Sequence, residues 1–150
     1  MYIFEKSVLI NCTIEKAFRF HSDTNNLAKI SPDNIKVRIM QLDLPVKEGS
    51  HIILKIRQFG FLSTVWELVI KNYRENYLIT DKLIKGPFKF WEHDHIFEDR
   101  EGKTLMTDRL KYEIPFGIFG KAAHSIFIKS QIEEQFRLRH EKTKAVLEEK

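Results

Sequence analysis

The chain has 150 residues, of which 43% are hydrophobic and 31% charged, with a formal charge of +4. This balance excludes a disordered chain, and the length suits a single domain over residues 1–150 that buries roughly 70% of its unfolded surface. The 25 basic and 21 acidic side chains are interspersed. Because no basic arm stands apart, we expect no nucleic-acid partner.

The cysteine content and the apolar runs bear on cellular location. Cys12 is the single cysteine, so it cannot form an internal disulfide, which favours a reducing cytoplasm. The opening residues are interrupted by Glu5 and Lys6 and lack the apolar run of a signal peptide. No segment approaches the roughly 18 apolar residues of a membrane span. We therefore expect a cytoplasmic protein with no integral membrane span.

The first part of the chain predicts one strand followed by two short helices. Residues 2–11 alternate in part between apolar and polar side chains, which is typical of a strand. Thr13 can cap a helix that runs to about Ser22. A second short helix, from about residue 27 to 30, should end before Pro32, because the residue preceding a proline avoids the helical region.

From Ile35 onward the hydrophobic pattern has a period of two, which predicts strands. Short turns join them, with no helix between, so the pattern predicts an antiparallel meander. With the first strand they make a seven-stranded sheet. The six later strands are expected at residues 35–39, 51–58, 63–72, 77–84, 88–97 and 104–114.

Residues 118–149 predict one long helix, with a kink or a start near Gly120. Side chains three and four positions apart share one face of a helix, and this face must cover an apolar surface. The order of elements therefore predicts an α+β fold with a helix packed on a curved sheet. The expected covering face comprises Ala122, Ser125, Lys129, Ile132, Phe136, His140, Thr143 and Leu147.

The sequence resembles a known family, most specifically over residues 86–120, GPFKFWEHDHIFEDREGKTLMTDRLKYEIPFGIFG. A Gly-Pro-Phe opening, a Trp-x-His-x-His strand, a Gly-x-Thr turn, Asp108, Tyr112 and Pro115 follow in the order seen in START-like (SRPBCC) proteins. The similar branch is the small bacterial one described as polyketide cyclase/dehydrase-like or coenzyme Q-binding-like. Phe136 and Arg139 extend the match, which covers the whole chain.

This resemblance implies a helix-grip fold with a deep pocket between the sheet and the C-terminal helix. In relatives the pocket takes lipids, quinones, polyketides or other hydrophobic molecules. The fold serves carriers, sensors and some enzymes, so it does not by itself decide the chemistry.

Two histidines lie on one face of the predicted strand 88–97. Successive side chains alternate between faces, so Trp91, His93, His95 and Phe97 lie together. The resemblance places this face inward, whereas alternation alone leaves both choices open. A metal would need a third ligand from Asp108, His21 or an acid on another strand, and no spacing motif marks one. We therefore expect no metal and no cofactor, and interpret the histidines as pocket-lining or hydrogen-bonded core residues.

The last strand places a carboxylate among apolar neighbours. Met106, Asp108, Leu110 and Tyr112 share the less basic face, which should point to the core. A buried Asp108 needs a partner, and His93 or His95 could supply it. The first interpretation is an ion pair that fixes strand register. Ligand contact and acid/base catalysis are the alternatives.

These features together predict a protein that binds a small hydrophobic ligand, such as a lipid, quinone or polyketide-like molecule, between the sheet and the C-terminal helix. One alternative is a cyclase/dehydratase-type enzyme with His95 and Asp108 as acid and base. Another is a protein-interaction module whose groove is filled by side chains, which a cavity of about 300 Å³ or more would exclude. The candidate ligand-binding residues are Trp91, His93, His95, Met106, Asp108, Tyr112, Ser125, Ile132 and Phe136.

Overall fold

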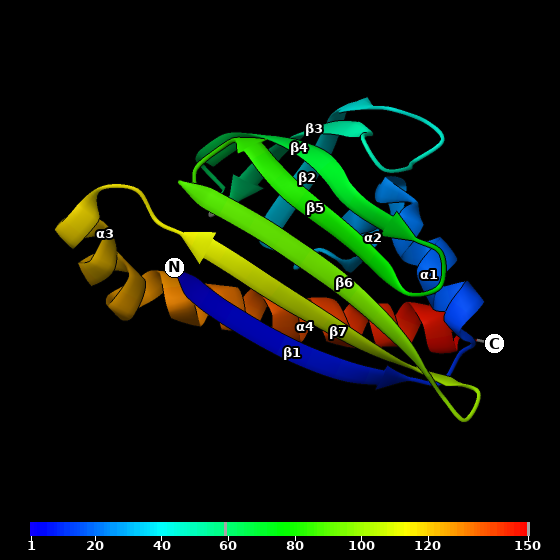
Figure 1. Ribbon diagram of the computed structural model, residues 1–150. Helices are drawn as coiled ribbons and strands as arrows, with labels where there is room; N and C mark the ends of the chain where they lie inside the picture. The colour runs from blue at the N-terminus through cyan, green and yellow to red at the C-terminus, as the bar shows by residue number, and fades with distance from the viewer. Residues whose placement is uncertain (59, 150) are drawn as a thin grey trace.

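The computed structural model describes residues 1–58 and 60–149, and its strands form one antiparallel sheet of seven strands. Their spatial order is β1-β7-β6-β5-β4-β3-β2, so the meander from β2 to β7 is confirmed and β1 pairs with the last strand (Figure 1). The strands are β1 (Tyr2–Ile10), β2 (Ile35–Leu42), β3 (His51–Gln58), β4 (Leu62–Arg74), β5 (Leu78–Lys85), β6 (Phe90–Arg100) and β7 (Lys103–Glu113).

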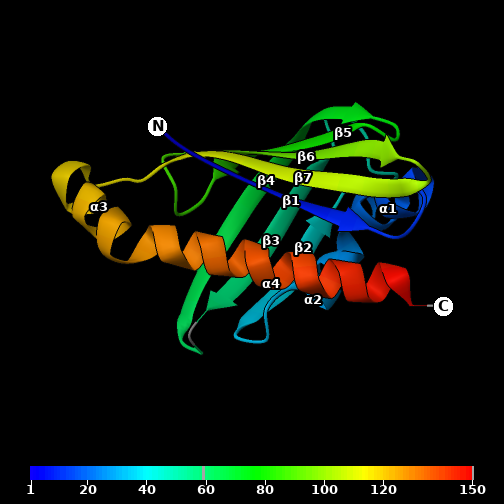
Figure 2. The same cartoon turned by 90° about the horizontal axis from the view of Figure 1, so that it is seen from below.

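The helices lie at both ends and across one face of this sheet. The long helix α4 crosses one face, while α1 and α2 lie at the opposite end of the sheet from α3 (Figure 2). None of the described helices is long and apolar enough to cross a membrane. The helical elements are α1 (Ile14–Ser22), a 3₁₀ turn η1 (Thr24–Asn26), α2 (Leu27–Ile30), α3 (Gly117–Ala123), a π-helical turn η2 (His124–Ile128) and α4 (Lys129–Glu148).

Local sequence accounts for the early helices. Thr13 has an extended backbone, and its hydroxyl accepts a hydrogen bond from the backbone N–H of Lys16, as expected of a helix N-cap. Ser31, which precedes Pro32, has an extended backbone with ψ of 142°, and α2 ends there. These two short helices cover the end of the sheet where the chain leaves β1.

The core fills the space between the sheet and the helices. Phe97 and Met106 on neighbouring strands are 1% and 0% exposed, and Phe18 of α1 packs edge-on against Phe97. A second cluster joins Leu110 of β7 to the covering helix. Each of these side chains contributes about 1.5 to 3 kcal/mol through burial, so α4 is part of the core rather than an appendage. The α4 residues that contact the second cluster are Ile132 and Phe136.

The interior face of the C-terminal helix departs from the expected one before residue 130. A π turn at His124–Ile128 holds about one residue more than an α turn, which shifts the phase of the helix. Gly120 and His124 are therefore buried, whereas Ala122, Ser125 and Lys129 are exposed. The expectation was wrong for these last three positions. It is confirmed for Ile132, Phe136, His140, Thr143 and Leu147, which are all buried.

The close approach of α3 to the end of β7 requires a glycine. A Cβ atom at Gly120 would overlap the carbonyl oxygen of Pro115, so a larger residue would push α3 away from the strand end. On its other side α3 exposes Ile118 and Phe119, which are 82% and 85% accessible to solvent. These two side chains therefore add little to the core.

Candidate functional site

A cavity of about 170 Å³ lies between the inner face of β2–β6, the α1–α2 segment and α4. Leu54, Trp66 and Leu68 form part of its apolar wall, and polar side chains gather at one end. The volume is below the roughly 300 Å³ of a typical pocket for a drug-sized ligand. It is close to that of an engineered cavity of about 150 Å³ that binds benzene. The groove is thus not filled by side chains, but it fits only a small ligand. Its polar end comprises His21, Asp81, His93, His95, Gln135 and Arg139, and the lining also includes Ser22, Asp23, Thr24, Asn26, Ser31 and Gln58.

Of the nine candidate residues, four line this cavity: Trp91, His93, His95 and Phe136. The inward orientation implied for the Trp91 face is therefore confirmed.

The other five candidates lie elsewhere. The face of β7 expected to point to the core does so, but α4 covers it directly, so this face is separated from the cavity. Ser125 is exposed and its hydroxyl donates to the carbonyl of Ala122, because the π turn rotates it away from the sheet. These five candidates therefore do not line this cavity, and a ligand-binding role for them is not supported by its lining. Met106, Asp108 and Tyr112 of β7 are buried under the C-terminal helix. Ile132 is the α4 residue that packs against this face.

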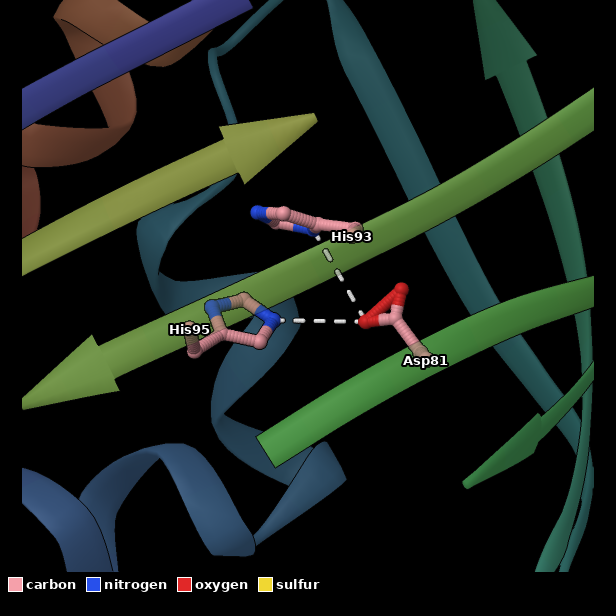
Figure 3. A group of neighbouring side chains, drawn as sticks. All are labelled: Asp81, His93 and His95. Carbon is pink, nitrogen blue, oxygen red and sulfur yellow. Dashed lines mark hydrogen bonds and ion pairs between the residues drawn. The ribbon is translucent and has the colours of Figure 1, made fainter. Parts of the chain in front are cut away.

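The polar end is built by three neighbouring strands. Asp81 of β5 lies directly opposite His93 of β6, and His95 of β6 lies opposite Asp108 of β7. Nε2 of His95 donates a hydrogen bond of 3.3 Å to Oδ1 of Asp81. Nδ1 of His93 lies 3.7 Å from the same oxygen (Figure 3). Asp81 therefore joins both histidines on the cavity side.

Asp108 joins the same histidines from the core side. Its Oδ1 accepts a hydrogen bond of 2.8 Å from Nε2 of His93 and lies 2.9 Å from Nδ1 of His95. Its Oδ2 accepts a hydrogen bond of 2.6 Å from Nε2 of His140 on α4. The prediction that His93 or His95 is the partner of Asp108 is confirmed. Because α4 adds a third histidine, the network also connects the helix to the sheet.

Two buried carboxylates set the charges in this network. Burial would raise the pKa of Asp108, but hydrogen bonds from His140 and His93 hold it well below its ordinary value. Burial opposes protonation of His95, but the carboxylates of Asp108 and Asp81 prevail and raise its pKa to about 9. Burial and the neighbouring charge of His95 lower the pKa of His93. At neutral pH His95 is therefore a cation at the cavity wall.

His21 brings a neutral imidazole to the same end. Its Nδ1 donates a hydrogen bond of 2.9 Å to the carbonyl of Ala17. Burial and the charge of His95 lower the pKa of His21 to about 4. In the part of the chain that the structure describes, the buried Nε2 of His21 has no hydrogen-bond partner. This nitrogen is thus an acceptor available to a ligand.

Arg139 provides a second positive charge beside the cavity. Its guanidinium lies 5.4 Å from the centre of the Phe136 ring, which holds it over the aromatic face. Together with His95 it places two positive charges at this end, beside the carboxylate of Asp81, whereas the wall as a whole is mostly apolar. The arrangement can hold an apolar body and donate hydrogen bonds to an oxygen at one end. Asp108 does not line the cavity, so it acts on a ligand only through His93 and His95.

Sequence reasoning did not identify Asp81 or the role of His21. Asp81 alternates in phase with Ile79, so an inward-facing acid on β5 was a signal that could have been found. The position of His21 depends on how α1 packs against the sheet, which no spacing in the sequence specifies.

The comparisons with known proteins agree with this architecture. The family model described as "Polyketide cyclase / dehydrase and lipid transport" matches residues 10–140. A search among curated proteins found no match.

Solved structures share the fold over nearly the whole chain. A protein of Chromobacterium violaceum has 10% identity and a TM-score of 0.81, and the alignment covers 100% of each chain. A START superfamily protein of Mycobacterium smegmatis has 18% identity and a TM-score of 0.75, covering 99% of this chain and 98% of that one. The di-domain ARO/CYC protein BexL, from the BE-7585A biosynthetic pathway, has 14% identity and a TM-score of 0.79, covering 99% of this chain and 50% of its own. At these identities the likeness shows the fold alone, and the helix-grip prediction is confirmed.

Proposed function

Because the chain belongs to the polyketide cyclase / dehydrase and lipid transport family, we propose that it binds a small, mostly apolar molecule that carries an anionic or carbonyl oxygen at one end. The observation that supports this proposal is a mostly apolar cavity wall with the cations of Arg139 and His95 at one end, which we call the cationic end. The volume of about 170 Å³ favours a ligand of one or two rings, or a short alkyl chain.

The ligand's apolar body would occupy the space between β3, β4 and α2. Burying its surface supplies most of the binding free energy, at about 25 cal/mol per Å². Its oxygen would lie near Arg139 and His95, which can donate hydrogen bonds to it. A carboxylate would be favoured over an alcohol, because the Arg139 guanidinium forms no ion pair with the described residues and a ligand carboxylate would supply its charge partner.

A matched pair of ligands tests this proposal in the presence of EDTA. Trp66 and Trp91 both line the cavity, so their fluorescence reports on binding. We expect phenylpropanoate to bind the parent more tightly than phenylpropanol of the same shape. Arg139→Gln should reduce this preference by about tenfold, or 1.4 kcal/mol.

The control for this test removes the same charge from the exposed side of α4. Arg137 pairs there with Glu134 and Glu141 and does not line the cavity, so Arg137→Gln should leave the preference unchanged. An equal affinity of the parent for the acid and the alcohol would contradict the cationic end, and no binding of either would contradict the proposal.

A further inference from the structure

Three potential metal-ligand atoms converge at the polar end of the cavity. They are Oδ1 of Asp81, Nδ1 of His93 and Nε2 of His95, and ligand atoms of these three residues lie within 4.8 Å of one another (Figure 3). The Asp81 oxygen is 3.3 Å from the His95 nitrogen and 3.7 Å from the His93 nitrogen. Figure 3 shows both imidazoles directed at the same side of the carboxylate.

These separations suit a tetrahedral ion. Zinc bonds to imidazole nitrogen and carboxylate oxygen are about 2.0 to 2.2 Å long, which places neighbouring ligands of a tetrahedron about 3.3 to 3.6 Å apart. Small rotations of the side chains would therefore bring all three atoms to bonding distance. Two imidazoles and one carboxylate form a ligand set that divalent transition metals favour.

Asp108 orients both imidazoles for this role. It accepts a hydrogen bond of 2.8 Å from Nε2 of His93 and lies 2.9 Å from Nδ1 of His95, so one nitrogen of each ring is beside Asp108. Each ring then presents its other nitrogen to the side where Asp81 lies. Metal-ligating histidines almost always donate their second N–H to a carboxylate or carbonyl in this way. His140 in turn holds the other oxygen of Asp108 at 2.6 Å.

We propose that Asp81, His93 and His95 bind one divalent transition-metal ion, with Asp108 as the positioning residue behind them. The sequence predicted no metal because no spacing motif marked a third ligand, and Asp81, an acid on another strand, provides that ligand. Two carboxylates, from Asp81 and Asp108, offset the charge of the ion. Because all three ligands line the cavity, the remaining coordination position opens toward it. This proposal does not rest on the proposed function, since the ligand atoms are in place whether or not an organic molecule binds.

The test uses Zn²⁺ and Co²⁺ as the probes on the full chain. Calorimetric titration of Zn²⁺ should give one site per chain, and Co²⁺ should give the intense visible absorption of a tetrahedral ion. Asp81→Asn and His95→Gln should each weaken Zn²⁺ binding by at least a hundredfold. Asp108→Asn should weaken it by about 10- to 100-fold, as expected of a residue that orients the ligands. His51→Gln, an exposed histidine on β3, is the matched control and should bind as the parent does.

A second measurement keeps the proposal testable if a variant does not fold. Anomalous scattering at the zinc edge, from parent crystals soaked in Zn²⁺, should show a peak between Asp81, His93 and His95. A peak only at surface carboxylates, or a titration of the parent without a stoichiometric site, would overturn the proposal. So would folded Asp81→Asn protein with unchanged affinity. Phenylpropanoate binding in EDTA would be unaffected by these results.

Discussion

Nε2 of His140 donates a hydrogen bond of 2.6 Å to Oδ2 of Asp108, and this contact connects the covering helix to the buried face of β7. Asp108 is fully buried and is shared by three histidines. Breaking such a network from one side leaves the remaining groups without their charge partner.

Asp108→Asn should therefore destabilise the fold by about 3 kcal/mol, because the amide cannot balance the charge on His95. Urea unfolding in EDTA measures the change in free energy. Asp33→Asn is the matched control: this exposed carboxylate near the start of β2 pairs only at the surface, with Lys142, so its loss should cost no more than about 1 kcal/mol. If the two variants have the same stability, Asp108 is not the charged centre of a buried network.

His21 should make the protein sensitive to mild acid. Its pKa is about 4 in the folded protein, against 6.5 for an unperturbed histidine, so the unfolded chain binds the proton more tightly. The contribution of neutral His21 is fully present above pH 6.5 and is lost as the pH falls to about 4. The maximum loss is about 3 kcal/mol.

His21→Asn tests this pH dependence, because its amide can still donate to Ala17 without gaining a charge. The groups facing His21 are His95, Asp108 and Arg139, and all three stay in the variant. Its free energy of unfolding should fall less than that of the parent between pH 6.5 and 4. His51→Asn should behave as the parent. Equal slopes for His21→Asn and the parent would show that His21 is not held neutral.

The π turn determines which residues of the C-terminal helix support the fold. Tyr112 and His124 share a hydrogen bond of 2.8 Å, and the His124 ring stacks on Tyr2 at 3.6 Å. His124→Ala should lower the free energy of unfolding by about 1 to 3 kcal/mol, because the buried Tyr112 hydroxyl loses its partner. Ser125→Ala, one residue along, should change it by less than about 0.5 kcal/mol. Thermal melts decide between this and a regular helix, in which Ser125 would be the sensitive position.

Much of the fold could be predicted from local patterns. Alternation indicated the strand positions, grouped His93 with His95 on one face and placed Asp108 on the less basic face of its strand, because period two is a local property of a strand. Which face of the histidine strand points inward came only from the family resemblance. The buried positions of α4 from Ile132 onward followed from helical spacing. The π turn could not be predicted, because it depends on how His124 packs against Tyr2 and Tyr112. The cavity's location was also missed, since it depends on where α4 leaves the sheet uncovered.

The cavity should bind a small, mostly apolar ligand. Val37 and Ile56 lie opposite each other on β2 and β3 and line its apolar wall. Val37→Phe should fill this part of the cavity at the cost of modest overpacking. Val65→Phe is the matched control, because Val65 is 55% exposed and does not line the cavity.

Calorimetric titration of phenylpropanoate into the parent and these two variants, in EDTA, is the most direct test. We predict that the parent and Val65→Phe bind with the same dissociation constant, and that Val37→Phe binds at least tenfold more weakly while still folded. Undiminished binding by Val37→Phe, or equal losses in both variants, would contradict the account.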